Sequence, residues 1–282
     1  MDSIDIRIKK ARSIIDEAEA IVIGAGAGLS TAAGIDFGGA RFQQLMPEFG
    51  EKYGYSDMYS GDFYPYETLE EYWAFEAKAI LVNRYDIPSL PLYHKILDIV
   101  KNRNYFVLTT NVENQFVKSG FSNDKVFATQ GDYSFFQCGV GCHKKLYYNE
   151  DIIRKMVANT KNCKIPSDLV PKCPVCGRPI KIHLRADQYF IEDEKWDMAC
   201  DRYEQFMSQT RNRKVVFLEF GVGFNTPGII RYPFEQHTYQ NPNAALIRFN
   251  KDYPNGAIEI ASHTMSFTED IQCVLEKMYP NI

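Results

Sequence analysis

An apolar run that opens into a glycine-rich turn places the strongest constraint on how this chain folds. Residues 20–23 read Ala-Ile-Val-Ile, and residues 24–30 read Gly-Ala-Gly-Ala-Gly-Leu-Ser. A buried strand that runs through glycines into a helix of small residues is typical of the first βα unit of a nucleotide-binding domain. Glycines let the backbone approach a pyrophosphate, and the helix start supplies N–H donors. The loop alone is also compatible with a tight strand–helix turn that binds no ligand.

Further short apolar runs follow, separated by segments with helical spacing of apolar residues. The predicted strands are residues 105–109, 126–128, 215–219, 244–249 and 258–261. Apolar strands that alternate with helices predict an α/β fold with a Rossmann-like, doubly wound parallel sheet. Ligands of such sheets bind outside the carboxyl ends of the strands. The residues at those ends are Gly26, Asn111, Gln130, Gly221 and Asn250.

Charge and hydropathy exclude several classes of function. The chain has 282 residues, a net charge of -4 and an estimated pI of 5.8, so no basic field indicates a nucleic-acid partner. The longest apolar runs are too short to span a bilayer, and the acidic first residues lack the apolar core of a secretory signal. We therefore expect no membrane association and a cytoplasmic location.

The cysteines indicate a metal site. Cys138 and Cys142 form one close pair, and Cys173 and Cys176 form a second pair after a gap of thirty residues. Two cysteine pairs on glycine-containing turns predict a tetrahedral Cys₄ zinc site. Because four thiolates fill the coordination sphere, we expect the Zn²⁺ to be structural. Cys163 and His143 are the alternative ligands.

The cysteine region suggests a module inserted into the nucleotide-binding domain. We expect residues 1–133 and 183–282 to form the Rossmann-like domain and residues 134–182 to form the zinc-binding module. Part of 38–90 could join the small domain. Residues 36–66, which overlap that segment, are rich in Gly, Tyr, Phe and Pro without clear periodicity, so they are predicted to form a mobile, aromatic loop region.

Several short motifs occur in the order in which sirtuins carry them. Residues 26–30 followed by Gly-Ile-Asp-Phe at 34–37 resemble the sirtuin GAGxS…GIPDF loop, and Thr-Asn-Val-Glu at 110–113 resembles the TQNID segment. Gln130-Gly131 precedes the first cysteine pair as the sirtuin HG dipeptide does. Residues 221–223 resemble the later GTS turn, and Asn250 the late asparagine. The chain is therefore similar to the sirtuin family over nearly its whole length.

This resemblance implies that NAD⁺ is the co-substrate and assigns residues to it. The glycine loop would hold the phosphates, Asp36 and Phe37 would lie near the nicotinamide, Asn111 would hold its ribose, and Glu113 would contact the carboxamide. The full set of cofactor-binding residues expected from the resemblance is Gly26, Ala27, Gly28, Ser30, Asp36, Phe37, Thr110, Asn111, Glu113, Gln130, Gly221, Gly223, Asn225, Asn250 and Lys251.

One departure from the sirtuin pattern bears on the reaction. Gln130 stands where deacylating sirtuins carry their general-base histidine. An amide has no pKa near neutrality and cannot accept the proton of a ribose hydroxyl, although it can orient that hydroxyl by hydrogen bonding. Deacylation needs that base, whereas direct attack of another nucleophile on the ribose carbon does not.

Such departures resemble class M sirtuins, the macrodomain-linked branch in which an asparagine, a glutamine and an arginine mark the active site. Asn111 and Gln130 match two of these, and the arginine is carried onto Arg185. The resemblance implies protein mono-ADP-ribosylation, with a lipoylated glycine cleavage H-like carrier protein as acceptor and a macrodomain hydrolase as a partner. Asn111 and Gln130 could instead cap strand ends, and Arg185 could be a surface ion-pair partner of Asp187 or Glu192.

Other functions remain open at this point. An NAD⁺ glycohydrolase would use water as the acceptor, a residual protein deacylase would retain the ordinary sirtuin reaction, and a sensor would bind NAD⁺ or ADP-ribose without chemistry. A hydride-transfer dehydrogenase fits least, because the acid that should hold the ribose about 20 residues after the glycine loop is absent.

Overall fold

The chain divides into two compact units in the computed structural model, which describes residues 3–281. The first unit contains the residues up to Gly34, Ser89–Gln130 and the residues from Glu194 onward, and the second contains Ile35–Pro88 and Gly131–Asp193. The second unit is thus larger than the module expected at 134–182, since it takes in the whole of 35–88 and begins and ends outside the cysteine region.

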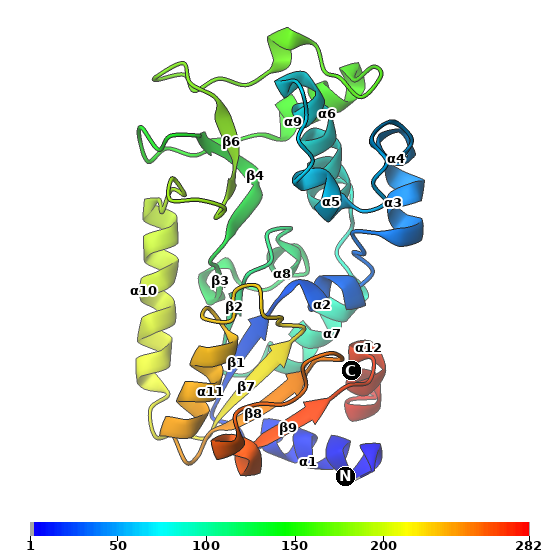
Figure 1. Ribbon diagram of the computed structural model, residues 1–282. Coiled ribbons are helices and arrows are strands. Elements are labelled where there is room, and N and C mark those ends of the chain that lie inside the picture. Colours follow the sequence, from blue (N-terminus) through cyan, green and yellow to red (C-terminus); the bar gives the residue numbers. More distant parts are fainter. Residues whose placement is uncertain (1–2, 282) are drawn as a thin grey trace. The chain divides into compact units, whose positions relative to one another are not determined.

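The first unit is built on a six-stranded parallel sheet (Figure 1). The strands lie in the order β3-β2-β1-β7-β8-β9, and every neighbouring pair is parallel. Their bounds are β1 Ala20–Ala25, β2 Tyr105–Thr109, β3 Val126–Ala128, β7 Val215–Phe220, β8 Ala245–Phe249 and β9 Thr264–Phe267. The chain moves outward from β1 to β3 and then returns to the other side of β1 at β7. The carboxyl ends of β1 and β7 therefore form the switch point at which such sheets bind ligands.

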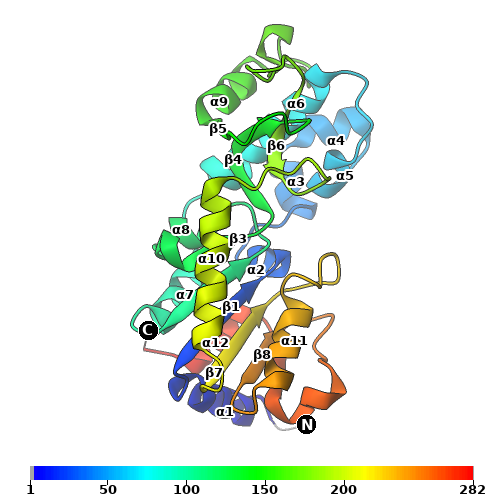
Figure 2. The same cartoon turned by 90° about the vertical axis from the view of Figure 1, so that its left-hand side faces the viewer.

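Helices cover both faces of this sheet, as Figures 1 and 2 show. Ile21 and Ile23 pack with α1, α7 and α12, whereas Ala20 and Val22 pack with α10 and α11. Alternate residues of a strand point to opposite faces, so a continuous apolar run is needed where both faces are covered. The helices of this unit are α1 Ile4–Asp16, α2 Ala27–Ala32, α7 Pro91–Val100, α8 Gln115–Lys118, α10 Glu194–Gln209, α11 Arg231–Gln240 and α12 Ile271–Met278, with 3₁₀ turns at Asn123–Lys125 and Ile258–His263.

The second unit combines a small antiparallel sheet with helices. Its strands lie in the order β5-β4-β6, with bounds β4 Gly131–Cys138, β5 Tyr147–Tyr148 and β6 Ile180–Leu184. The helices are α3 Gly39–Leu45, α4 Pro47–Tyr53, α5 Met58–Asp62, α6 Leu69–Ile80 and α9 Glu150–Asn159, with a π-helical turn at Leu81–Tyr85 and a 3₁₀ turn at Ser167–Leu169. Trp73 of α6 packs against Phe136 of β4, with ring centroids 5.1 Å apart. This unit therefore has an apolar core of its own.

Two expectations from the sequence are wrong. Residues 258–261 form a 3₁₀ turn, and the last strand lies later, at Thr264–Phe267. The segment 36–66 contains three short helices in place of an aromatic loop. Phe42, Phe49 and Met58 lie on the core side of those helices and are almost fully buried. Because each helix is seven residues or shorter, the sequence offers too few turns for a helical period to stand out.

Among residues 3–281, no helix is both long enough and apolar enough to cross a membrane.

Candidate functional site

Two glycine turns meet at the switch point of the sheet. The Gly28 amide donates to the carbonyl of Gly221 at 3.0 Å, and the Gly26 amide donates to that of Phe220 at 3.0 Å. A Cβ on Gly28 would lie 2.7 Å from the Gly221 Cα, and a Cβ on Gly26 would lie 2.8 Å from the Gly221 oxygen. Gly221 itself has a φ of +58°, a left-handed conformation that favours glycine. These glycines are needed because the ends of β1 and β7 touch there.

A pocket of about 830 Å³ opens beside these turns, within the first unit. Its volume lies in the range of small-molecule and cofactor sites. Most residues expected to bind the cofactor line it, and these are Gly26, Ala27, Gly28, Thr110, Gln130, Gly221, Gly223, Asn225, Asn250 and Lys251. The Asn250 amide donates to the carbonyl of Val222 at 2.8 Å, which joins the turn after β8 to the turn after β7.

Ser30, Asn111 and Glu113 form a buried network beneath the glycine loop. The Asn111 Nδ2 donates to the Gly26 carbonyl at 3.1 Å and to the Ser30 Oγ at 3.0 Å. The Ser30 Oγ donates to the Glu113 Oε1 at 2.8 Å, and the Tyr93 hydroxyl donates to the same oxygen at 3.1 Å. Burial raises the pKa of Glu113, and the donors around the carboxylate oppose that rise. The structure therefore brings these three predicted residues together through hydrogen bonds.

Gln130 follows β3 and lines the same pocket. Its Oε1 is buried and has no hydrogen-bond partner among the described residues. A buried acceptor without a partner costs free energy, so this atom favours accepting a hydrogen bond from a water molecule or a ligand in the pocket.

Asp36, Phe37 and Arg185 belong to the second unit. The Asp36 carboxylate accepts the Gly38 amide at 3.0 Å, and Phe37 packs against that unit's core. Arg185 donates to the Glu192 carboxylate at 2.6 Å, and its guanidinium stacks on Phe190 at 4.3 Å. The ion pair with Glu192, one of the two considered from the sequence, is therefore present.

His183 lies close to Arg185 in sequence but is held as a packing residue. It is buried, its ring stacks on Phe190 with centroids 4.6 Å apart, and its Nε2 is 2.9 Å from the Ile191 carbonyl oxygen. Burial lowers the pKa of His183, which keeps the ring neutral near pH 7.

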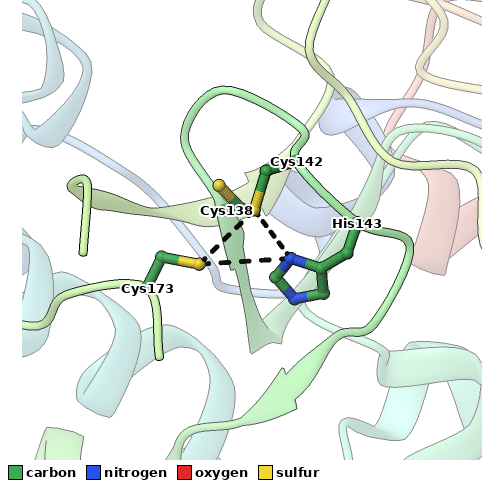
Figure 3. A group of neighbouring side chains, drawn as sticks. All are labelled: Cys138, Cys142, His143 and Cys173. Carbon is green, nitrogen blue, oxygen red and sulfur yellow. Dashed lines mark hydrogen bonds between the residues drawn. The ribbon is translucent and has the colours of Figure 1, made fainter. Parts of the chain in front are cut away.

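Three of the predicted zinc ligands, Cys138, Cys142 and Cys173, gather with His143 near the end of β4 (Figure 3). The sulfurs of Cys138 and Cys176 are 3.7 Å apart, as are those of Cys142 and Cys173. His143 lies beside them, with its Nδ1 3.0 Å from the Cys142 Sγ. Four convergent thiols with distances of this size suit a tetrahedral Zn²⁺ ion. Burial alone would raise the pKa of Cys138, but backbone amides and neighbouring thiols lower it to about 6. The donor set therefore fits a structural zinc ion.

The fold resembles that of sirtuins. A Sir2 homologue solved as an NAD complex has a TM-score of 0.60 and 15% identity, covering 96% of this chain and 92% of that one. A Sir2 structure bound to a propionylated peptide has a TM-score of 0.60 and 17% identity, covering 97% of both chains. No family model matches the chain.

A protein ADP-ribosyltransferase of Staphylococcus aureus is 37% identical over 276 residues, which cover 98% of this chain and 88% of the relative. The chain belongs to the sirtuin-type protein ADP-ribosyltransferases. The family predicted from the motif order is thereby confirmed. A second relative of this ADP-ribosyltransferase is a probable bifunctional ADP-ribose hydrolase/ADP-ribosyltransferase of Fusarium oxysporum f. sp. cubense. It is 28% identical over 80% of this chain, and the match spans 39% of its own length.

Some pocket residues of this ADP-ribosyltransferase were missed by sequence reasoning. These are Thr31, Ala32, Val222, Phe224, Thr226, Phe249, Asp252, Tyr253 and the segment 268–271. The segment 268–271 directly follows β9 and would have been found as another strand end had the last strand been assigned to 264–267. Phe224 and Tyr253 lie in segments without periodic pattern, and only the structure shows their rings in contact, with centroids 4.9 Å apart.

A buried ion network fixes the loop that follows β8. Arg248 makes a bidentate contact with Glu219 at 2.7 and 2.9 Å, and both side chains are fully buried. Arg248 also donates to the carbonyl of Asn255, and Arg231 donates to the carbonyls of Tyr253 and Asn255. Burial raises the pKa of Glu219, and Arg248 opposes that rise. The arginines therefore hold the backbone of a loop that lines the pocket.

Replacing Arg248 with Leu is expected to destabilise the first unit by about 3–5 kcal/mol, because Glu219 would remain buried without its main partner. At this size, the melting temperature should fall by about 10 °C. Calorimetry checks this result. Lys214→Met is the control, because it removes only the exposed ion pair with Glu17 and should cost less than about 1 kcal/mol. A melting temperature of Arg248→Leu equal to that of Lys214→Met would contradict the prediction.

Proposed function

We propose that this enzyme cleaves the glycosidic bond between nicotinamide and ribose in NAD⁺ and transfers the ADP-ribose to a side chain of a protein acceptor. The observation that carries the proposal is the pocket at the switch point of the sheet, lined by the glycine loop after β1 and the glycine turn after β7. Membership of the ADP-ribosyltransferase family supports the reaction type.

The pocket residues suit the adenosine diphosphate part of the molecule. The amides of Gly26 and Gly28 already donate to carbonyls at the end of β7. These glycines therefore serve the site mainly by letting the backbone come close to the ligand, and less as hydrogen-bond donors to it. Gly221, Gly223, Asn225, Asn250 and Lys251 line the opposite side of the pocket. Lys251 is exposed and supplies a positive charge near a ligand that carries two phosphates.

The bond that breaks joins the ribose C1′ to the nicotinamide nitrogen. Nicotinamide leaves with the bonding electrons as a neutral base, and the acceptor side chain forms the new bond to C1′ and loses its proton. Positioning is the main contribution that a protein makes to such a step. Asn111 and Gln130 are proposed to orient the ribose hydroxyls through their amides. The Oε1 of Gln130 supports this role, because no group among the described residues donates to this acceptor and a ribose hydroxyl can do so.

Arg185 is proposed to orient either an acidic acceptor or the co-substrate. Its guanidinium already holds the carboxylate of Glu192 while stacked on Phe190, an arrangement that prepares it for bidentate contact with another carboxylate or a phosphate. Asp36 and Phe37 are proposed to act near the nicotinamide, as the resemblance implies.

The acceptor is proposed to be a lipoylated glycine cleavage H-like carrier protein, and the partner a macrodomain hydrolase that removes the modification. The Fusarium relative, which is named for both ADP-ribose hydrolase and transferase activities, supports a functional link between the two reactions.

The proposal is tested with NAD⁺ labelled in its adenylate phosphate. The purified enzyme is incubated with the lipoylated carrier or with the same carrier lacking lipoate, and the label is followed by electrophoresis and chromatography. We expect label on the lipoylated carrier together with one nicotinamide released per ADP-ribose transferred. The unlipoylated carrier is the matched control for acceptor choice.

Each competing function gives a different result in this assay. Free ADP-ribose without labelled carrier would indicate a glycohydrolase. Nicotinamide release that requires an acylated peptide and yields an acylated ADP-ribose would indicate a deacylase. Bound but intact NAD⁺ would indicate a sensor and would contradict the proposed transfer.

A further inference from the structure

A carboxylate is buried beneath the glycine loop and does not line the pocket. Glu113 is 3% exposed, and its Oε1 accepts hydroxyl protons from Ser30 of α2 and Tyr93 of α7. Tyr93 is fully buried, and its ring packs against Phe116 with centroids 4.9 Å apart. The contacts of the Oε1 atom therefore lie inside the first unit.

The Ser30 Oγ also lies 3.3 Å from the Tyr93 hydroxyl, where either group can donate, but the hydrogen bonds that link Glu113 to Asn111 have one direction when Glu113 is a carboxylate. A serine hydroxyl has one proton, and because Ser30 donates it to Glu113, the Ser30 oxygen is left to accept. It accepts from the Nδ2 of Asn111, whose second amide proton is donated to the carbonyl of Gly26. Both protons of the Asn111 amide are thus directed into the protein, and its Oδ1 is left as the acceptor for another group.

The backbone around Asn111 is fixed independently of Glu113. The Asn111 amide donates to the Thr109 Oγ1 at 3.0 Å, and the Thr110 amide donates to the carbonyl of Ala25 at 3.0 Å. What Glu113 contributes to Asn111 is therefore the orientation of its side chain, which it sets through Ser30. If Glu113 were Gln, its amide could donate to Ser30 and release the serine proton toward Asn111. If the Asn111 amide turned over to accept that proton, its Oδ1 and Nδ2 would exchange places and an oxygen would face the Gly26 carbonyl oxygen. Neither orientation of the Asn111 amide would then satisfy both Ser30 and Gly26.

We propose that Glu113 and Tyr93 are positioning residues that act through Ser30 to hold the Asn111 amide with its Oδ1 available to accept a hydroxyl of the nicotinamide ribose. This role differs from the contact with the carboxamide that the family resemblance implies for Glu113. The proposal rests on the proposed function, because the ribose belongs to the NAD⁺ that this function requires. The orientation of the Asn111 amide, in contrast, is a property of the protein without ligand.

The first test compares two ligands. NAD⁺ carries the nicotinamide ribose and AMP does not, so calorimetric titration of both separates the two parts of the pocket. For Glu113→Gln we expect NAD⁺ to bind about tenfold more weakly, the loss typical of one hydrogen-bonding group, with AMP binding unchanged. Tyr93→Phe, which removes only a hydroxyl, should show a smaller loss of the same kind. Tyr105→Phe is the control, because the hydroxyl of this buried tyrosine of β2 hydrogen-bonds the backbone at Ser122.

The same variants made in the Asn111→Ala background test whether Glu113 acts through Asn111. We expect Glu113→Gln to cause no further loss of NAD⁺ affinity there. An equal tenfold loss in both backgrounds, or equal weakening of NAD⁺ and AMP, would overturn the inference and leave Glu113 a merely structural residue.

A measurement without ligand keeps this test separate from the proposed function. In protein labelled with ¹⁵N-asparagine, the two side-chain amide protons of Asn111 should exchange slowly with water, and Glu113→Gln should accelerate their exchange at least about tenfold. Unchanged exchange would overturn the inference whether or not the enzyme binds NAD⁺. Accelerated exchange in a protein that does not bind NAD⁺ would instead support the hydrogen-bond network and contradict the proposed function.

Discussion

Cys138→Ser and Cys173→Ser are expected to lose the zinc ion and to unfold the cysteine region of the second unit. Both residues are buried, and serine does not replace a thiolate ligand. Structural zinc contributes about 10–16 kcal/mol in zinc-finger peptides at pH 7, which is far more than any single contact in this unit. The unit also has its own apolar core, so we expect helices α3–α6 to persist while the residues around 138–180 lose their fixed structure.

Zinc content and tryptophan fluorescence check this prediction together. The chain has two tryptophans, and Trp73 packs on Phe136, two residues before Cys138. In a Trp196→Phe background the emission reports only the second unit, and it should shift to the red when the metal is lost. Zinc should fall from about one equivalent per chain to less than about one-tenth, since a missing ligand removes most of the binding energy.

Cys163→Ser is the matched control for zinc loss. Cys163 is also buried in the second unit, but its sulfur contacts the carbonyl of Glu48 at 3.4 Å. This variant should retain zinc, and so should His143→Ala, because four thiolates remain. A Cys138→Ser protein that still holds one zinc ion would contradict the Cys₄ assignment, and zinc loss in His143→Ala would identify the histidine as a ligand.

Asn111→Ala and Gln130→Ala are each expected to reduce the rate of nicotinamide release by about 100-fold. The physical reason is positioning, since a small misplacement of a reacting group costs about this factor. The effect should appear mainly in kcat if the amides hold the ribose more tightly as its bond breaks, and mainly in KM if they hold the bound NAD⁺ equally well. Initial rates of nicotinamide formation at several NAD⁺ concentrations distinguish the two.

The control for these variants removes an asparagine amide at the other end of the sheet. Asn241 donates to the carbonyl of Arg213, just before β7, and does not line the pocket described above. Asn241→Ala should retain the wild-type rate. Wild-type rates in both Asn111→Ala and Gln130→Ala would refute their assignment to the site and would favour the simpler role of capping the strand ends.

Part of the fold was readable from the chain alone. The apolar run at 20–23, followed by glycines, predicted β1, and the buried runs at 105–109 and 215–219 predicted β2 and β7, which the structure places on either side of β1. These strands are covered on both faces, and continuous apolar sequence is the physical requirement for that position. The last strand was misplaced because residues 258–261 are as apolar as 264–267, and only packing against β8 distinguishes them.

The candidate site, like the fold, was predicted from the sequence only in part. Residue type and spacing predicted the four cysteines, because zinc requires thiolates that chain turns can bring to one ion. They also predicted the glycine loop, and motif order identified Asn111, Gln130 and the family. The contact of Gly28 with Gly221 is different, since it joins residues far apart in the chain and depends on β1 and β7 lying side by side.

The sequence by itself therefore determined the fold class and the family, and it predicted cysteines that the structure brings together, because these follow from local patterns of residue type. The tertiary structure alone decided what surrounds each side chain. It placed Tyr93 and Ser30 on Glu113, and Arg248 on Glu219, through contacts between distant segments. Burial and hydrogen-bond direction arise only when those segments pack together, and they determine whether an amide or a carboxylate faces a substrate or supports a residue that does.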